Sequence, residues 1–248
     1  MTTPTTPTTP TSSPTPANRR APAATLRVAG LRVEYGPVVA LREVELCVEP
    51  GTLLAVSGPS GAGKSSLLWA LAGALMPAAG AVHLGDTQIT GRHQAAALGV
   101  AIIPQGNALS SALTAHENVL VPLLAARVQP READRRSTAA LAAVGLEDSG
   151  RHLVEELSGG QQQRVAIART LAAGACVLLA DEPTSDLDGA NRQRVIDALR
   201  REAADGAVVV MSTHGPEAAA QADAELALDE GRMTWARAGV AAAAHPGT

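Results

Sequence analysis

Gly58-Pro-Ser-Gly-Ala-Gly-Lys-Ser65 lies between an apolar run, residues 52–57, and a segment with the pattern of a helix that begins at Ser65. The stretch matches the spacing G-x-x-x-x-G-K-[ST], in which glycines let backbone N–H groups wrap around phosphate oxygens at a helix N-terminus. It therefore predicts a phosphate-binding loop between a strand and a helix, and hence an α/β nucleotide-binding core.

The loop also carries the charge and the hydroxyl that ATP and Mg²⁺ require. Lys64 is the single lysine of a chain with 19 arginines, and an ammonium group is the point charge that this motif places on the β- and γ-phosphates. Ser65 offers a hydroxyl to Mg²⁺. The expected nucleotide contacts of this stretch are Gly58, Pro59, Ser60, Gly61, Ala62, Gly63, Lys64, Ser65 and Ser66.

Two acids, Asp181 and Glu182, follow a second apolar run at residues 176–180. In phosphate-loop enzymes an acid at such a strand end holds Mg²⁺, and a neighbouring carboxylate polarises the attacking water. We therefore expect Asp181 at the metal and Glu182 as the general base. Two acids after an apolar run are, taken alone, more typical of a solvated strand end, so the phosphate loop is what favours the catalytic interpretation.

A third motif, Leu157-Ser-Gly-Gly-Gln-Gln-Gln-Arg164, narrows the choice among phosphate-loop enzymes. Ser158 and Gln161 have the spacing of a helix capping box, which is a complete structural explanation for those two residues. Gly159-Gly160, however, weakens a first helical turn unless another molecule must approach the backbone, as a phosphate would. The stretch resembles the signature sequence of ABC ATPases, and it lies between the phosphate loop and the acidic strand, as it does in that family.

The resemblance implies a dimer in which two ATP molecules lie between head-to-tail subunits, because each signature faces the phosphate loop of the other subunit. The partner is expected to be a second copy or a paired ABC ATPase subunit. Ser185-Asp-Leu-Asp188 resembles the loop that crosses this interface, although Asp188 also suits a helix cap. Contacts to nucleotide at the interface are then expected from Ser158, Gly159, Gly160, Gln161 and Asp188.

Three more residues occupy positions that the family uses. Tyr35, the only tyrosine, precedes the phosphate loop, as does the aromatic residue that stacks on adenine. Gln105 follows an apolar run and resembles the glutamine that reaches Mg²⁺ and the attacking water. His214 ends a strand-like run and resembles the histidine that contacts the γ-phosphate. The resemblance thus implies a catalytic set of Glu182, His214 and Gln105, and a metal set of Ser65, Gln105 and Asp181.

The resemblance covers residues 25–235 and implies an α/β phosphate-loop NTPase fold, the ABC ATPase core with a parallel sheet. Antiparallel β structure is expected around residues 26–56, and a helical subdomain is expected as an insertion at about residues 93–157. The Thr- and Pro-rich residues 1–24 and the residues 236–248 are expected to be flexible tails.

Two helices of the insertion have clear local signals. Thr114-Ala-His-Glu117 has the spacing of a capping box, and Pro122 is expected to kink the helix that follows. A second amphipathic helix is expected over residues 130–144, ending at Gly145.

Composition limits the possible partners. The net charge of -4, with 24 acidic and 20 basic residues, lacks the basic excess typical of nucleic-acid binding, so no nucleic acid is expected. Residues 65–85 form an uncharged stretch that approaches the length of a membrane span. Glycine and proline interrupt it, so no membrane span is expected. The resemblance then implies a cytoplasmic ATPase, peripheral on the inner face of the cell membrane and bound to a separate transmembrane permease.

Three functions compete at this point. The first is the motor subunit of an ABC transporter. Residues 114–122 resemble the corresponding stretch in the branch of the family that serves lipoprotein release and macrolide export. The second is a soluble, non-transport ABC ATPase acting on ribosomes or DNA, which would usually show two fused halves or a long coiled coil. The third is a phosphate-loop kinase or GTPase, against which the signature stretch and His214 argue.

Overall fold

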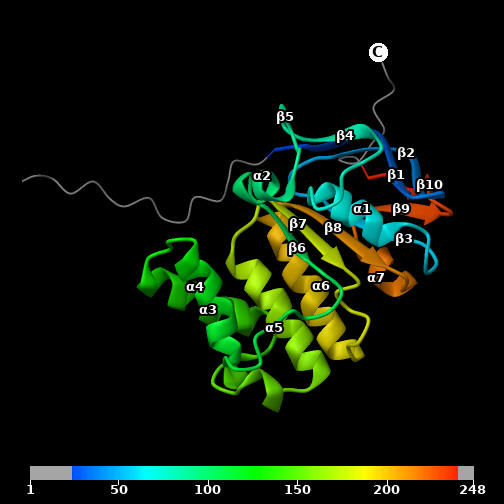
Figure 1. Ribbon diagram of the computed structural model, residues 1–248. Coiled ribbons are helices and arrows are strands. Elements are labelled where there is room, and N and C mark those ends of the chain that lie inside the picture. Colours follow the sequence, from blue (N-terminus) through cyan, green and yellow to red (C-terminus); the bar gives the residue numbers. More distant parts are fainter. Residues whose placement is uncertain (1–23, 240–248) are drawn as a thin grey trace, which may run out of the picture.

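The computed structural model describes residues 24–239, which form two β-sheets and a group of helices (Figure 1). The expected tails at residues 1–23 and 240–248 lie outside the described residues. The strands are β1 (Leu26–Tyr35), β2 (Val38–Val48), β3 (Leu53–Ser57), β4 (Ala79–Leu84), β5 (Thr87–Gln88), β6 (Val100–Ile103), β7 (Val177–Asp181), β8 (Val208–Thr213), β9 (Ala224–Asp229) and β10 (Arg232–Arg237). The α-helices are α1 (Lys64–Leu71), α2 (Arg92–Ala97), α3 (Ala115–Ala125), α4 (Pro130–Ala143), α5 (Gly159–Ala172), α6 (Gly189–Ala204) and α7 (Pro216–Ala220), with short 3₁₀ turns η1 (Glu147–Ser149) and η2 (Val154–Glu156).

The smaller sheet is antiparallel, with strand order β2-β1-β4-β5. Its presence confirms the expected antiparallel portion, with two corrections. The expected range, residues 26–56, includes most of β3, yet β3 joins the other sheet because four of its five residues are buried, as in a central parallel strand. Conversely, β4 and β5 follow α1 in the chain and still complete the antiparallel sheet.

The larger sheet has the order β10-β9-β3-β8-β7-β6, and only β10 runs antiparallel to its neighbour. All residues of β7 and β8 are buried, which explains their continuous apolar sequences. The register pairs Ser57 with Thr213, and Asp181 with Ser212, so the carboxyl ends of β3, β8 and β7 lie at one edge. This arrangement confirms the expected parallel sheet, with the phosphate loop and the acidic strand at its C-terminal edge.

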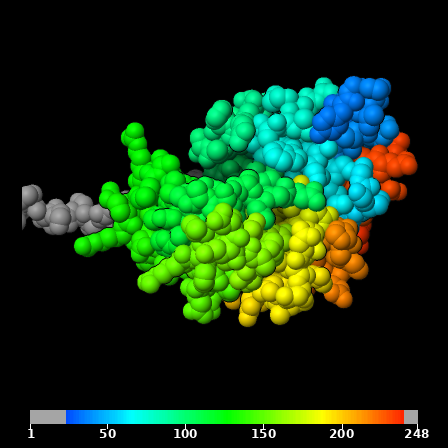
Figure 2. All heavy atoms as spheres, turned by 60° about the horizontal axis from the view of Figure 1, so that its bottom comes forward, coloured from blue at the N-terminus to red at the C-terminus, as the bar shows by residue number. Residues whose placement is uncertain are grey.

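Helices α3, α4 and α5 lie on one side of the larger sheet, away from the antiparallel sheet (Figure 1). The space-filling view shows α3 and α4, in green, extending to the left of the body that the sheets form (Figure 2). The capping box at Thr114 is present, since its Oγ1 accepts the N–H of Glu117 at 3.2 Å while Glu117 Oε2 accepts the N–H of Thr114 at 2.8 Å. Pro122 lies inside α3, which continues to Ala125, and α4 ends before Gly145 as expected.

The expected insertion, residues 93–157, begins too early as a helical segment. Strand β6 lies within it and pairs in parallel with β7, because its apolar residues complete the edge of the larger sheet. The continuous helical part therefore starts at α3. Within residues 24–239, no helix combines the length and the apolar character that a membrane span needs.

Candidate functional site

A cavity of about 680 Å³ opens at the carboxyl edge of the larger sheet. It is lined by Tyr35, Ala40, Ser60, Gly61, Gly63, Lys64, Ser65, Ser66, Gln105, Glu182, Ser185 and His214. All of these except Ala40 and Ser185 are nucleotide-site residues expected from the sequence. Segments almost 180 positions apart thus contribute to one space, because the parallel strands bring their following loops together.

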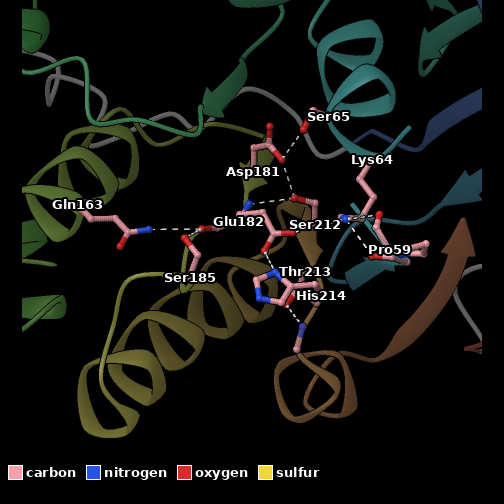
Figure 3. A network of polar contacts seen from close by, with 12 residues as sticks. Pro59, Lys64, Ser65, Gln163, Asp181, Glu182, Ser185, Ser212, Thr213 and His214 are labelled. Atoms are coloured by element: carbon pink, nitrogen blue, oxygen red, sulfur yellow. Dashed lines mark hydrogen bonds and ion pairs between the residues drawn. The ribbon is translucent and has the colours of Figure 1, made fainter. Parts of the chain in front are cut away.

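The phosphate loop follows β3 and enters α1 at Lys64. Gly58 and Gly63 have φ angles of +142° and +104°, and a Cβ at these positions would lie 2.1 Å from Leu228 O and 2.5 Å from Ala40 O, respectively. Only glycine therefore fits at both positions. The Lys64 ammonium donates to the carbonyls of Gly58 at 2.9 Å and Pro59 at 3.0 Å, so its charge lies over the loop (Figure 3).

Asp181 is the last residue of β7, and its side chain is buried. Its Oδ1 accepts hydrogen bonds from Ser65 Oγ at 3.1 Å and from Ser212 Oγ at 2.7 Å (Figure 3). The structure therefore brings the hydroxyl and the carboxylate expected at the metal into contact, and Gln105 lines the same cavity. The side-chain oxygens of Ser65, Asp181 and Gln105 are few and are hard ligands. Such a set fits Mg²⁺, which keeps several of its waters and also binds substrate phosphates.

Glu182 follows directly and connects two basic groups. Its Oε1 lies 3.6 Å from Lys64 Nζ, and its Oε2 lies 2.9 Å from His214 Nδ1. Only 12% of the Glu182 side chain is exposed, compared with 65% for His214. A carboxylate held beside the phosphate loop in this way is placed to accept a proton from water next to a bound phosphate, which is the chemistry of ATP hydrolysis.

Tyr35 ends β1 at the rim of the cavity. Its hydroxyl lies 3.3 Å from Ser66 Oγ, and half of the residue is exposed. A half-exposed aromatic ring beside the phosphate loop leaves a face for a planar base.

The signature residues lie at the start of α5, and none of them lines the cavity among the described residues. The capping box is present: Ser158 Oγ accepts the N–H of Gln161 at 3.3 Å, and Gln161 Oε1 accepts the N–H of Ser158 at 2.9 Å. Ser158 and Gly159 are exposed, and Gly160 is half-buried. The structure therefore does not bring the expected signature contacts to this chain's own phosphate loop.

Asp188 also lies outside the cavity, and its carboxylate caps α6. Its Oδ1 accepts the backbone N–H of Asn191 at 2.9 Å, and this hydrogen bond lowers the pKa of Asp188 below its usual value. The helix-cap role expected from the sequence is confirmed.

Sequence reasoning missed three polar residues at the acidic strand end. Ser212 contacts Asp181 and the backbone of Glu182, while Gln163 and Ser185 contact the Glu182 carbonyl. A polar residue ending the apolar run of β8 was the available signal for Ser212, but its partner depends on strand register.

Comparisons with known proteins agree with this geometry. The family described as ABC transporter matches residues 41–185. The lipoprotein-releasing system ATP-binding protein LolD of Ruegeria pomeroyi is 41% identical over 222 residues, covering 85% of this chain and 97% of LolD. The macrolide export ATP-binding/permease protein MacB of Rhodopseudomonas palustris is 38% identical over 224 residues, covering 87% of this chain and 34% of MacB.

A solved structure is similar over nearly its whole length. It is the ATP-binding cassette MJ0796, described as a dimer in a post-hydrolysis state bound to ADP and Pi, with a TM-score of 0.77 and 29% identity over 86% of this chain and 99% of that one. These relatives match the resemblance to the lipoprotein-release and macrolide-export branch. The chain therefore belongs to the ABC transporter family, as an ATP-binding subunit that hydrolyses ATP.

Proposed function

We propose that this chain is the motor subunit of a transporter whose membrane-spanning permease is a separate chain. The observation that carries the proposal is the convergence of Lys64, Glu182 and His214 on one cavity at the carboxyl edge of the larger sheet, where Asp181 accepts a hydrogen bond from the cavity residue Ser65. LolD, which this chain covers almost completely, is named as an ATP-binding protein of a lipoprotein-releasing system. MacB is named as both ATP-binding and permease protein, and this chain spans only about a third of it.

Seven side chains in and beside the cavity have proposed roles in ATP binding and hydrolysis. Lys64 and the loop N–H groups bind the β- and γ-phosphates, and Tyr35 stacks on adenine. Ser65, Asp181 and Gln105 hold Mg²⁺, which neutralises phosphate charge when bound.

The two remaining groups handle the water. Glu182 accepts a proton from the attacking water. His214 orients the Glu182 carboxylate through the 2.9 Å contact, and His214 then contacts the γ-phosphate when ATP is bound. Hydrolysis then needs no covalent intermediate on the protein.

The exposed signature points to a head-to-tail dimer around two ATP molecules. Gly159 offers bare backbone at the positive end of α5, and the side chains of Ser158 and Gln161 already cap that end. A γ-phosphate bound to a second subunit would satisfy this surface. MJ0796 has been described as a dimer, which supports the same assembly here.

The proposed location is the inner face of the cell membrane, where the helical subdomain contacts the permease. The ATPase domain is proposed to occupy residues 25–235, with β10 extending two residues further. The permease is proposed to be of the lipoprotein-release or macrolide-export kind, as the named relatives suggest.

The test is affinity purification of the Glu182→Gln variant from detergent-solubilised native membranes with ATP and Mg²⁺. This change keeps ATP binding and removes the base, so the ATP-bound dimer is expected to persist and to retain a polytopic membrane protein. The matched control adds Lys64→Ala to the same variant, which removes ATP binding and is expected to lose the permease. Recovery of ribosomes, DNA or no partner would favour the soluble, non-transport ABC ATPase.

A further inference from the structure

Ser212 is a fully buried polar residue near the end of β8, after the apolar residues Val208–Met211. The parallel register pairs it with Asp181 on β7. Its hydroxyl therefore lies at the end of the acidic strand, between the two acids of the site (Figure 3). It does not line the cavity, so its effect on the reaction must pass through other residues.

The Ser212 hydroxyl has one hydrogen bond to each acid. It donates to Asp181 Oδ1 at 2.7 Å and accepts the backbone N–H of Glu182 at 2.9 Å. Because the hydroxyl is buried, water cannot readily replace either bond when it is removed. One side chain thus ties the carboxylate proposed for Mg²⁺ to the backbone of the proposed base.

The backbone of Glu182 has an unusual conformation that needs such support. Its φ angle is +50°, in the left-handed region that non-glycine residues seldom adopt. The N–H is held by Ser212, and the carbonyl accepts from Gln163 Nε2 at 3.3 Å and from Ser185 Oγ at 3.2 Å. The peptide groups on both sides of Glu182 are therefore restrained while its carboxylate contacts Lys64 and His214.

We propose that Ser212 is a positioning residue of the ATPase reaction, whose hydroxyl keeps Asp181 and Glu182 aligned for catalysis. This inference rests on the proposed roles of these two acids. Without the hydroxyl, Asp181 Oδ1 keeps the hydrogen bond from Ser65 and loses the one from Ser212. The backbone N–H of Glu182 also loses its hydrogen-bond acceptor. Lys64, the phosphate loop and Tyr35 have no hydrogen bond to Ser212 among the described residues, so ATP affinity depends little on it.

The experiment compares steady-state ATP hydrolysis by the full chain and its Ser212→Ala variant. Hydrogen-bond partners of a metal-binding carboxylate typically contribute about 10–100-fold to activity or metal affinity. We expect kcat to fall by about tenfold, the Mg²⁺ concentration for half-maximal rate to rise several-fold, and KM for ATP to stay within about threefold. Ser212→Thr, which keeps a hydroxyl, is expected to recover most of the lost kcat.

Ser137→Ala is the matched control. Ser137 is equally buried, and its hydroxyl donates to Ala133 O at 2.8 Å within α4, remote from the acids. This variant also loses one buried serine hydroxyl, but its kcat and Mg²⁺ dependence are expected to stay parental. If Ser212→Ala does not fold, Ser212→Cys is measured in its place. The thiol has a similar shape but is a weaker hydrogen-bond donor, so this variant is expected to have a reduced kcat.

Parental kcat and Mg²⁺ dependence in Ser212→Ala or Ser212→Cys would overturn the inference. An equal loss in Ser137→Ala, or no recovery in a folded Ser212→Thr, would also overturn it, because the effect would then be structural. Glu182→Gln is assayed in parallel to separate the two proposals. If Glu182→Gln is inactive while Ser212→Ala is parental, only the Ser212 inference fails; if Glu182→Gln hydrolyses ATP at the parental rate, the proposed base is wrong.

Discussion

The carboxyl edge of the larger sheet and the N-terminus of α5 are both suited to phosphate, yet they are constructed differently. At the sheet edge, Glu182 contacts both Lys64 and His214, and Asp181 accepts hydrogen bonds from both Ser65 and Ser212. At the start of α5, the hydrogen bonds of the Ser158 and Gln161 side chains within the described part of the chain are to that helix end, and Gly159 is exposed.

This difference shows how the site is divided. Strand register assembles the first region from four distant segments of one chain, and the result is a nearly complete set of charges. Local capping assembles the second region from four consecutive residues, and it presents the positive end of a helix without a phosphate partner in its own chain. The comparison therefore predicts that changes in the first region impair each subunit, whereas changes in the second impair only the dimer.

Lys64→Ala is expected to have the largest effect. It removes the ammonium that contacts the carbonyls of Gly58 and Pro59 and lies near Glu182. ATP affinity should fall by at least about 100-fold, in the range seen when one member of a buried charge pair is truncated, and hydrolysis should be lost. Titration with a fluorescent ATP analogue measures this loss on the isolated subunit.

Two variants serve as comparisons for Lys64→Ala. Lys64→Arg should also bind ATP poorly, because a planar guanidinium does not replace a compact ammonium inside the loop. Arg135→Ala removes an exposed cation of α4 and should leave ATP affinity unchanged. Near-parental affinity in Lys64→Ala would mean that the sheet edge is not the nucleotide site.

Gly159→Asp tests the second region, and its effect on hydrolysis is expected to be smaller, roughly 10–100-fold. A Cβ at Gly159 meets no atom within 4 Å, so the isolated subunit has room for the side chain. An acidic residue in a first helical turn stabilises the helix by about 0.3–1 kcal/mol, but it would repel a γ-phosphate. Thermal unfolding and ATP binding by the subunit should be preserved, while hydrolysis and ATP-dependent dimerisation fall.

The matched control is Gly91→Asp, which precedes α2 and likewise has open space around its Cβ. It should unfold, bind and hydrolyse as the parent does. Parental hydrolysis in Gly159→Asp would instead show that no phosphate binds at the start of α5.

The smallest expected effect is that of Glu132→Gln, which measures how much the ion pairs within α4 stabilise the fold. Hydrogen bonds from Arg135 and Arg136 hold the pKa of Glu132 at about 2, below its usual 4.5. A lowered folded-state pKa stabilises the fold above the unfolded pKa, and the contribution is lost as pH falls from about 4.5 towards 2. At neutral pH the variant should unfold only about 1–2 °C lower, as for a surface ion pair.

Differential scanning calorimetry across pH measures this contribution. The difference in Tm between parent and Glu132→Gln should be present at pH 7 and should shrink as pH falls below about 4.5. Glu155→Gln, an exposed carboxylate without an ion pair within the described part of the chain, is the control and should show little difference at neutral pH. A constant difference for Glu132→Gln would show that packing, rather than the ionised carboxylate, is responsible.

Local patterns in the sequence were enough to predict the phosphate loop, both capping boxes and the cap at Asp188. Each depends on residues a few positions apart, so chain geometry alone sets their contacts. Family resemblance added Tyr35, Gln105 and His214, and the structure places all three around the cavity.

The division of strands between the sheets and the Ser212 contacts could not be predicted in the same way. The range expected for the antiparallel portion overlapped β3, and the range expected for the helical insertion contained β6, yet both strands belong to the larger sheet. Strands β4 and β5 were not expected in the antiparallel sheet. Ser212 meets Asp181 only because β7 and β8 pair in one register, and a shift by one residue would turn its hydroxyl to the other face. The sequence alone determines short-range motifs, because their residues are close along the chain. The contact between Ser212 and Asp181, across 31 positions, depends on how the buried strands pair and pack.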